Sequence, residues 1–459
     1  MSSILEDIKK KTTQLEANMQ NYDQTYSSFY LDKPQTFNVG FDIIDSWALD
    51  RTKLALIVAS PHGDKFEKYT FWDLRLLSNR FANLLRTLGA KKGDRLFIML
   101  PKIHTWHVAM IGAAKLGMVS MPATTMCTTR DVTFRIRSAE AKFVITDIEN
   151  VSKFSLQDLG LKAIITVDGP ANDTVDYGSE MKRMPNEIDA ETIGTTEISD
   201  TAIIWFTSGT EGPPKMVLHT HEYFLSHYIT AKFWMDLRPT DVHWTLSDTG
   251  WAKATYGYFS GQWLLGATVL QHDWRGKFDP DQTLNVLKNA GVTTFCAPPT
   301  AWRMIVRQEF DRDVTSSLRH CTSAGEPLNP EIMRIWKEKT GLTIYDGYGQ
   351  TETVIMVANF RSLQVKPGSM GKPIPGWDVE IVDEEGVEQP PGTEGFIAAR
   401  VQPKRPNGLF KEYWKDAETT SSRFKAGFYY TGDRGFKDED GYFWFVARSD
   451  DVIKSAAYR

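Results

Sequence analysis

The segment from Thr207 to Lys215 (TSGTEGPPK) has the residue types that bind a polyphosphate. Its glycines permit backbone conformations that point successive N–H groups at one anion. The hydroxyls of Thr207, Ser208 and Thr210 add donors, and Lys215 supplies a compact positive charge. The segment is not a Walker A loop, because two prolines precede the lysine and no Ser or Thr follows it. Taken alone, it could also be a solvated turn between a strand and a helix.

The same loop resembles the signature TSGTTGxPK of the adenylate-forming superfamily, which includes acyl-CoA synthetases, luciferases and the adenylation domains of peptide synthetases. Four further segments resemble motifs of this family and follow in its order: SAGEPL at 323–328, YDGYGQTE at 345–352, YTGD at 430–433 and RSDD at 448–451. Taken alone, the residues of each motif could be core, turn-capping or surface residues. Five motifs in the family's order argue against coincidence. The resemblance covers residues 39–459.

The resemblance implies a site for ATP and Mg²⁺. Tyr348 would stack on adenine, Thr351 would touch the α-phosphate and Glu352 would bind the metal. Asp433 would accept hydrogen bonds from the ribose hydroxyls, with Arg448 nearby. These residue types suit the roles, because an aromatic face packs on a purine and carboxylates bind ribose hydroxyls or Mg²⁺. The implied ATP-binding set is Thr207, Ser208, Gly209, Thr210, Gly212, Lys215, Gly325, Glu326, Pro327, Asp346, Gly347, Tyr348, Gly349, Gln350, Thr351, Asp433 and Arg448.

Within the superfamily, the segments 246–251 and 261–263 look like the short- and medium-chain acyl-CoA synthetases. Acetyl-specific members carry a Trp where this chain has Gly349. Removing an indole from the pocket wall leaves space for several methylenes, each contributing ~0.8 kcal/mol when buried. We therefore expect a carboxylic acid longer than acetate, or a compact aromatic acid. Trp251 and Met126 are the candidate pocket walls, although Trp251 could equally be an ordinary core residue.

The last residues resemble the family's hinge and part of its CoA site. Asp450 would be the hinge pivot, and the CoA-binding residues would be Ala456, Ala457, Tyr458 and Arg459. Ala457 replaces a glycine beside which the pantetheine passes. Glu211 replaces a Thr or Ser and brings negative charge near the polyphosphate, so we expect it to point outward. Family members continue into a small mobile domain that carries the adenylation lysine, so we expect this chain to be catalytically incomplete.

These motifs require an α/β scaffold to position them. Thr70 to Asp73 forms a capping-box pattern that predicts the start of a helix. Short apolar runs separated by stretches long enough for helices predict mostly parallel, helix-covered sheets. These runs lie at 95–100, 142–146, 162–167, 202–206, 267–270 and 292–295.

Beyond residue 368 the pattern changes to dense turns between short alternating runs at 379–382, 396–401 and 442–446. That change predicts a smaller antiparallel β-barrel-like subdomain. The expected division is therefore 1–367 for tandem α/β subdomains, 368–447 for the barrel-like part and 448–459 for the hinge, without the small C-terminal domain.

The composition narrows the function classes. Among 459 residues the formal charge is −5, which disfavours nucleic acid as the main partner. The three cysteines, Cys127, Cys296 and Cys321, form neither a disulfide framework nor a zinc motif. The apolar run 106–119 is too short to span a bilayer, and the first 20 residues do not resemble a leader peptide. These features predict a cytoplasmic enzyme, with a homodimer as a possible assembly.

Three functions remain open. The leading hypothesis is an acyl-CoA synthetase that uses ATP, Mg²⁺ and CoA to activate a medium-chain or compact aromatic acid. The second is an acyl-AMP ligase that loads a carrier protein. The third is a degenerate relative that binds acyl or nucleotide ligands without turnover.

Overall fold

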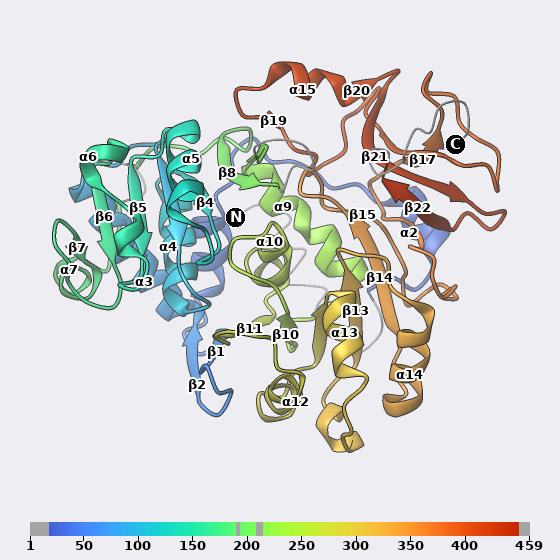
Figure 1. Ribbon diagram of the computed structural model, residues 1–459, viewed down its shortest axis with the longest axis horizontal. Helices are drawn as coiled ribbons and strands as arrows, with labels where there is room; N and C mark the ends of the chain where they lie inside the picture. Colours follow the sequence, from blue (N-terminus) through green and yellow to red (C-terminus); the bar gives the residue numbers. More distant parts are fainter. Residues whose placement is uncertain (1–17, 190–192, 208–213, 449–459) are drawn as a thin grey trace.

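Three β-sheets organise the chain in the computed structural model, which describes residues 18–189, 193–207 and 214–448 (Figure 1). Two are large and mostly parallel, and the third is smaller and antiparallel. The predicted α/β class is confirmed, and so is the combination of two helix-covered sheets with an antiparallel subdomain.

The eight-stranded sheet has the order β19-β9-β8-β4-β3-β5-β6-β7. The strands from β8 to β7 pair in parallel, whereas β9 and β19 add to the edge in antiparallel pairings. Its strands are β3 (Arg95–Met99), β4 (Val119–Pro122), β5 (Phe143–Thr146), β6 (Ala163–Thr166), β7 (Val175–Asp176), β8 (Thr201–Phe206), β9 (Met216–Thr220) and β19 (Glu412–Tyr413).

The nine-stranded sheet has the order β16-β15-β14-β13-β12-β10-β11-β1-β2. Its centre from β14 to β1 is parallel, and its two edges are antiparallel. Its strands are β1 (Leu54–Ala59), β2 (Phe66–Thr70), β10 (Val242–Thr245), β11 (Thr268–His272), β12 (Thr294–Ala297), β13 (His320–Ala324), β14 (Ile344–Gly349), β15 (Ile355–Ala358) and β16 (Lys372–Pro373). The central strands are buried along their length, as expected for a parallel sheet covered on both faces.

The antiparallel sheet joins five strands near the end of the described chain. They are β17 (Val379–Val382), β18 (Gly395–Arg400), β20 (Phe424–Lys425), β21 (Phe428–Lys437) and β22 (Phe443–Arg448). Two short strands from the same part of the sequence, β16 and β19, belong instead to the two large sheets. The division into 1–367, 368–447 and 448–459 therefore stays a prediction.

Helices connect the strands and cover most of the faces of the large sheets. They are α2 (Tyr22–Ser28), α3 (Phe71–Thr87), α4 (His104–Lys115), α5 (Thr129–Ala139), α6 (Leu156–Leu159), α7 (Tyr177–Arg183), α9 (His221–Ile229), α10 (Lys253–Tyr258), α11 (Gly261–Leu264), α12 (Pro280–Asn289), α13 (Pro299–Ile305), α14 (Pro330–Thr340) and α15 (Ala417–Ser422), with 3₁₀ or π turns at Val39–Asp45, Val151–Lys153, Thr230–Trp234 and Arg312–Thr315. α3 begins at the predicted capping box, in which Thr70 and Asp73 each accept a hydrogen bond from the other's backbone N–H.

The interior is apolar around two buried helices. All of α9 except Glu222 is buried, and the helix lies near the centre of Figure 1. The apolar run at 106–119 forms most of α4 and then enters β4. Lys115, at the end of α4, is fully buried, and its Nζ donates hydrogen bonds to Asp45 and Asn79. Across the described ranges, no helix combines the length and apolar character needed to cross a membrane.

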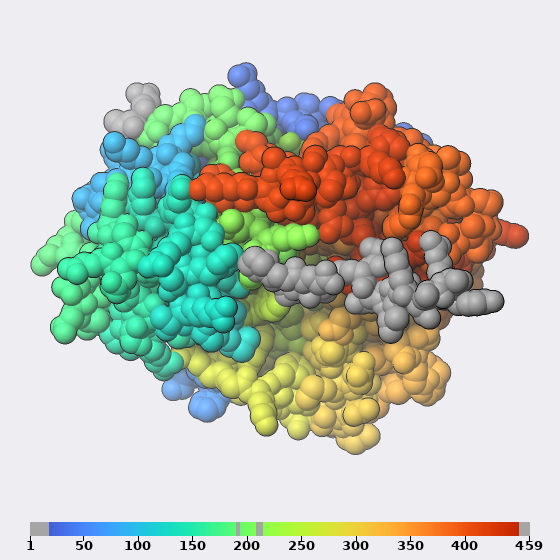
Figure 2. Space-filling model, turned by 45° about the horizontal axis from the view of Figure 1, so that its top comes forward, coloured from blue at the N-terminus to red at the C-terminus, as the bar shows by residue number. Residues whose placement is uncertain are grey.

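Segments far apart in the sequence lie together on one face of the molecule. Figure 2 shows teal, yellow-to-orange and red regions around the green middle of the chain. Residues at or just after the carboxyl ends of β10, β12, β13 and β14 line one cavity, so loops from several strands contribute to one site.

Candidate active site

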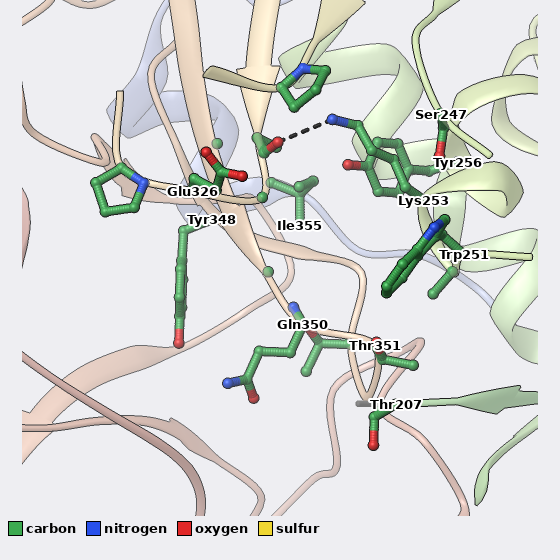
Figure 3. A pocket seen from close by; sticks show the side chains of 18 of the residues that line it. Thr207, Ser247, Trp251, Lys253, Tyr256, Glu326, Tyr348, Gln350, Thr351 and Ile355 are labelled. Atoms are coloured by element: carbon green, nitrogen blue, oxygen red, sulfur yellow. Dashed lines mark hydrogen bonds between the residues drawn. The ribbon is translucent and has the colours of Figure 1, made fainter. Parts of the chain in front are cut away.

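A cavity of about 1130 Å³ lies at the carboxyl ends of strands from both large sheets (Figure 3). Its lining includes Phe206 at the end of β8, Ala324 at the end of β13 and Gly349 at the end of β14. In α/β folds, ligands bind where such strand ends converge. The predicted site residues that line this cavity are Thr207, Lys215, Trp251, Gly325, Glu326, Pro327, Asp346, Gly347, Tyr348, Gly349, Gln350, Thr351, Glu352, Asp433 and Arg448.

The segment after β13 presents backbone to the cavity. Gly325 has a φ of +109° and open space where a side chain would be. A positive φ favours glycine, and the absence of a side chain leaves the peptide edge accessible to a planar ligand. Glu326 and Tyr348 lie near each other in Figure 3, and Pro327 lines the same cavity, so the predicted adenine-binding residues share one region.

Asp433 is held by two donors from the neighbouring motif. The Tyr348 hydroxyl donates to Asp433 Oδ2 at 2.5 Å, and Gln350 Nε2 donates to the same oxygen at 2.8 Å. Burial and the Asp433 charge raise the pKa of Tyr348 well above its usual value, so the phenol remains a donor. These bonds fix both the aromatic ring and the carboxylate before any ligand binds.

The phosphate loop is closed at its base. The backbone N–H of Thr207 donates to the carbonyl oxygen of Lys215 at 3.0 Å, and both residues line the cavity. Four predicted phosphate-binding residues lie outside the described part of the chain: Ser208, Gly209, Thr210 and Gly212. Glu211, expected to point outward, lies outside it as well.

The turn that carries Thr351 and Glu352 is anchored from behind. Buried His219 on β9 donates from Nε2 to the carbonyl oxygen of Thr351 at 2.7 Å, and burial lowers the pKa of this histidine to about 3. The backbone N–H of Phe410 donates to the carbonyl of Glu352 at 2.7 Å. The Tyr413 hydroxyl donates to Glu352 Oε1, also at 2.7 Å. Two of these bonds hold the backbone of the turn, and the third holds the Glu352 side chain.

Glu352 supplies a single carboxylate, which suits Mg²⁺ but not a metal ion whose ligands all come from the protein. No group of three or more His, Cys, Asp or Glu side chains suited to a metal ion occurs in the residues that the structure describes. Mg²⁺ in nucleotide sites is usually bound by one or two carboxylates, substrate phosphates and water. Glu352 meets that requirement because it lines the cavity together with Thr351 and Lys215.

The predicted acyl-pocket residues have different positions. Trp251 lines the cavity and is 48% exposed, so it is not an ordinary core residue. Gly349 also lines the cavity, but a Cβ there would lie 2.6 Å from the carbonyl oxygen of Val354. A side chain at 349 would therefore displace β15 as well as fill space. Met126 is 75% exposed and is not among the lining residues, so the structure gives it no place in the pocket.

Several residues of the site were not found from the sequence. Lys253 lines the cavity beside Trp251 and Tyr256, and its Nζ donates to the carbonyl of Ala324 at 2.9 Å (Figure 3). Burial lowers the pKa of Lys253. The signal for Lys253 in the sequence was its position two residues after Trp251, a predicted pocket residue. His219 and Tyr413 had no local signal, because their contacts depend on strand pairing.

The predicted hinge and CoA residues Asp450, Ala456, Ala457, Tyr458 and Arg459 lie outside the described residues. Arg448, which precedes them, lines the cavity and pairs in register with Asp433 across β22 and β21. The strand that carries the predicted ribose carboxylate thus lies beside the end of the described chain.

The fold and the cavity together define a nucleotide-binding α/β enzyme. A family model described as "AMP-binding enzyme" matches residues 45–414. The chain therefore belongs to the AMP-binding enzymes, within the acyl-CoA synthetase branch, and is an ATP-dependent acid–thiol ligase that uses ATP, Mg²⁺ and CoA.

Both relatives and solved structures support this membership. The chain is 40% identical over 474 residues to acyl-coenzyme A synthetase ACSM3, mitochondrial, of Mus musculus, covering 100% of this chain and 80% of that protein. It is 38% identical to acyl-coenzyme A synthetase ACSM4, mitochondrial, of Homo sapiens, covering 93% and 75%. The crystal structure of Brucella canis acyl-CoA synthetase matches with a TM-score of 0.86 at 28% identity, covering 96% and 82%. The anthranilate CoA ligase AuaEII in complex with anthranoyl-AMP matches with a TM-score of 0.82 at 26% identity, covering 93% and 81%.

The comparisons overturn the expected cytoplasmic location. The relatives ACSM3, ACSM4 and ACSM5 are all named as mitochondrial proteins. The expectation rested on overall composition and on the first 20 residues. Overall composition is a poor guide to compartment, because a water-exposed enzyme surface is similar in the cytoplasm and in the mitochondrial matrix.

Proposed function

We propose that this enzyme activates a medium-chain or compact aromatic carboxylic acid. The acid's carboxylate attacks the α-phosphorus of MgATP, giving acyl-AMP and pyrophosphate, and the thiol of CoA then attacks the acyl carbon, releasing AMP. The observation that carries this proposal is the shared cavity. The residues proposed to bind adenine, ribose, phosphate and metal line the same cavity as Trp251.

We assign the nucleotide roles to the motif residues. Tyr348 presents its ring to adenine, Asp433 accepts from the ribose hydroxyls, and Lys215 and Thr351 bind phosphate oxygens. Mg²⁺, bound through Glu352, would neutralise negative charge on the phosphates. Phosphoryl transfer needs positioning and charge stabilisation more than a nucleophilic side chain, and this set of residues supplies both.

The proposed size of the acid follows from the absence of a side chain at Gly349. Trp251 and Gly349 line the same cavity, and we infer that the absence of a side chain at 349 lets this cavity admit more than an acetyl group. The indole of Trp251 would pack against methylenes or an aromatic ring. AuaEII, a structural neighbour, is named for an aromatic acid, which keeps the compact aromatic alternative open.

Product analysis tests the proposal. The protein expressed from its full native gene is incubated with MgATP and either octanoate or benzoate, together with CoA or a phosphopantetheinyl carrier protein, and AMP and thioester are quantified. We expect AMP and acyl-CoA in equal amounts with free CoA, and much less of both for Glu352→Gln. Thioester on the carrier alone would instead support a carrier-loading ligase. Tight acyl-AMP binding without any product would support a non-catalytic binding protein.

We also propose that the enzyme resides in mitochondria, as its relatives' names indicate for them. Fractionation of cells expressing the native gene with a C-terminal tag tests this. Recovery with matrix markers is expected, and recovery with cytosolic markers would contradict it.

A further inference from the structure

Two groups of opposite charge face the cavity without pairing with each other. Lys215 and Glu352 both line it, yet no ion pair between them occurs among the described residues. Tyr413 contacts both of them. Its hydroxyl donates to Glu352 Oε1 at 2.7 Å, and the Nζ of Lys215 lies 5.3 Å from the centre of its ring.

Strand pairing fixes Tyr413 in this position. It lies on β19, where it is 2% exposed and pairs in register with Val217 of β9, the strand that follows the phosphate loop. Its backbone N–H also donates to the Thr420 hydroxyl at 2.9 Å.

We propose that Tyr413 is a positioning residue that keeps the phosphate-binding cation and the metal-binding carboxylate apart and correctly aimed. The hydroxyl occupies one oxygen of Glu352 and would leave the other available to Mg²⁺, while the ring face would hold the Lys215 ammonium at the cavity, where phosphates would bind. Without Tyr413, the two side chains would neutralise each other when the site is empty. The inference rests on the proposed metal role of Glu352.

Equilibrium binding of ATP, measured by calorimetry with excess EDTA and again with excess Mg²⁺, tests the inference. The ratio of the two affinities is the gain due to Mg²⁺.

For Tyr413→Phe we expect this gain to fall by about tenfold, as for loss of one hydrogen bond to a carboxylate, with unchanged affinity in EDTA. For Tyr413→Leu we expect a further loss of about two- to fivefold in EDTA, because Lys215 loses the ring face. Tyr442→Phe, which removes another buried tyrosine hydroxyl bonded to a carbonyl far along the chain, is the matched control and should change neither affinity.

The outcomes separate this inference from the proposed function. If Tyr413→Phe keeps the full gain, or loses affinity equally with and without Mg²⁺, the positioning role is overturned. If Glu352→Gln itself keeps the full gain, the metal role of Glu352 fails first, and the inference fails with it. Lys215→Ala gives an independent test should the tyrosine variants not fold. This variant should weaken ATP binding by the same factor in EDTA and in Mg²⁺. Loss of the affinity gain due to Mg²⁺ would contradict the positioning role of Tyr413.

Discussion

The carboxylate of Asp433 is oriented before a nucleotide arrives. Two neutral donors, the Tyr348 hydroxyl and the Gln350 amide, hold one of its oxygens. Preorganised groups of this kind bind a ligand without the cost of ordering a flexible side chain.

The proposed ribose contact predicts that Asp433→Asn weakens ATP binding by roughly 10- to 100-fold, the range for hydrogen bonds to a charged group. Asn keeps the shape but loses the charge, and its amide would face two donors that need an acceptor. Calorimetric titration with ATP measures the effect. Asp378→Asn, an exposed carboxylate paired with Arg400, is the control and should bind ATP as the unmodified protein does. Equal affinities for both variants would contradict the assignment.

Asp346 should give the protein a distinctive dependence of stability on pH. This residue is 6% exposed, and burial raises its pKa to about 8. In the unfolded chain it titrates near its usual value of about 4. Between these values the folded state holds a proton that the unfolded state has released, so stability falls as pH rises from about 4 to 8.

Asp346→Asn cannot ionise and should remove this contribution. Relative to the variant, the unmodified protein should therefore lose melting temperature as pH is raised from 5 to 8. Thermal unfolding of both proteins across this range measures the difference. A difference in melting temperature that stays constant with pH would show that Asp346 does not titrate in this way.

The sequence predicted much of the site because its motifs are contiguous. Tyr348, Gln350, Thr351 and Glu352 lie within one strand and the turn that follows it, so their order alone places them together. Tyr413 is 61 residues from Glu352 and reaches it only because a two-residue strand pairs with β9. A contact that depends on so short a strand leaves no local pattern to detect.

At the scale of elements, the predicted strands and capping box rested on strong local patterns. The run at 379–382 is β17 with the same bounds, and the run at 202–206 lies within β8. The short strands β16 and β19 were not predicted, because two residues are too few for alternation to register.

The capping box of α3 gives a direct test at this scale. Thr70→Ala removes the side-chain oxygen that accepts from Asp73 N–H and should lower the free energy of unfolding by about 1 kcal/mol. Thr70→Ser keeps the hydroxyl and should lose much less. Urea denaturation measures both variants. Equal losses would show that the hydroxyl does not cap the helix.

At the scale of the whole molecule, the cavity exists because three sheets share it. β8 contributes the base of the proposed phosphate loop, β13 and β14 the residues proposed to bind adenine, and β21 the carboxylate proposed to bind ribose. β19, from the last part of the described chain, ties Glu352, the proposed metal ligand, to the eight-stranded sheet through Tyr413. The strand order of the sheets brings these distant segments to one cavity. Local sequence patterns do not predict such contacts, so only the family resemblance indicated them.

The central claim is that this cavity holds an acyl-adenylate whose acyl group is longer than acetyl. Thermal unfolding with non-hydrolysable acyl-AMP analogues of increasing acyl length, all at one concentration, tests it most directly. A ligand at a hundredfold its dissociation constant stabilises the folded state by about 2.7 kcal/mol, which moves the melting temperature measurably. We predict the largest shift at intermediate acyl lengths. The largest shift with acetyl-AMP, or no shift at any length, would contradict it.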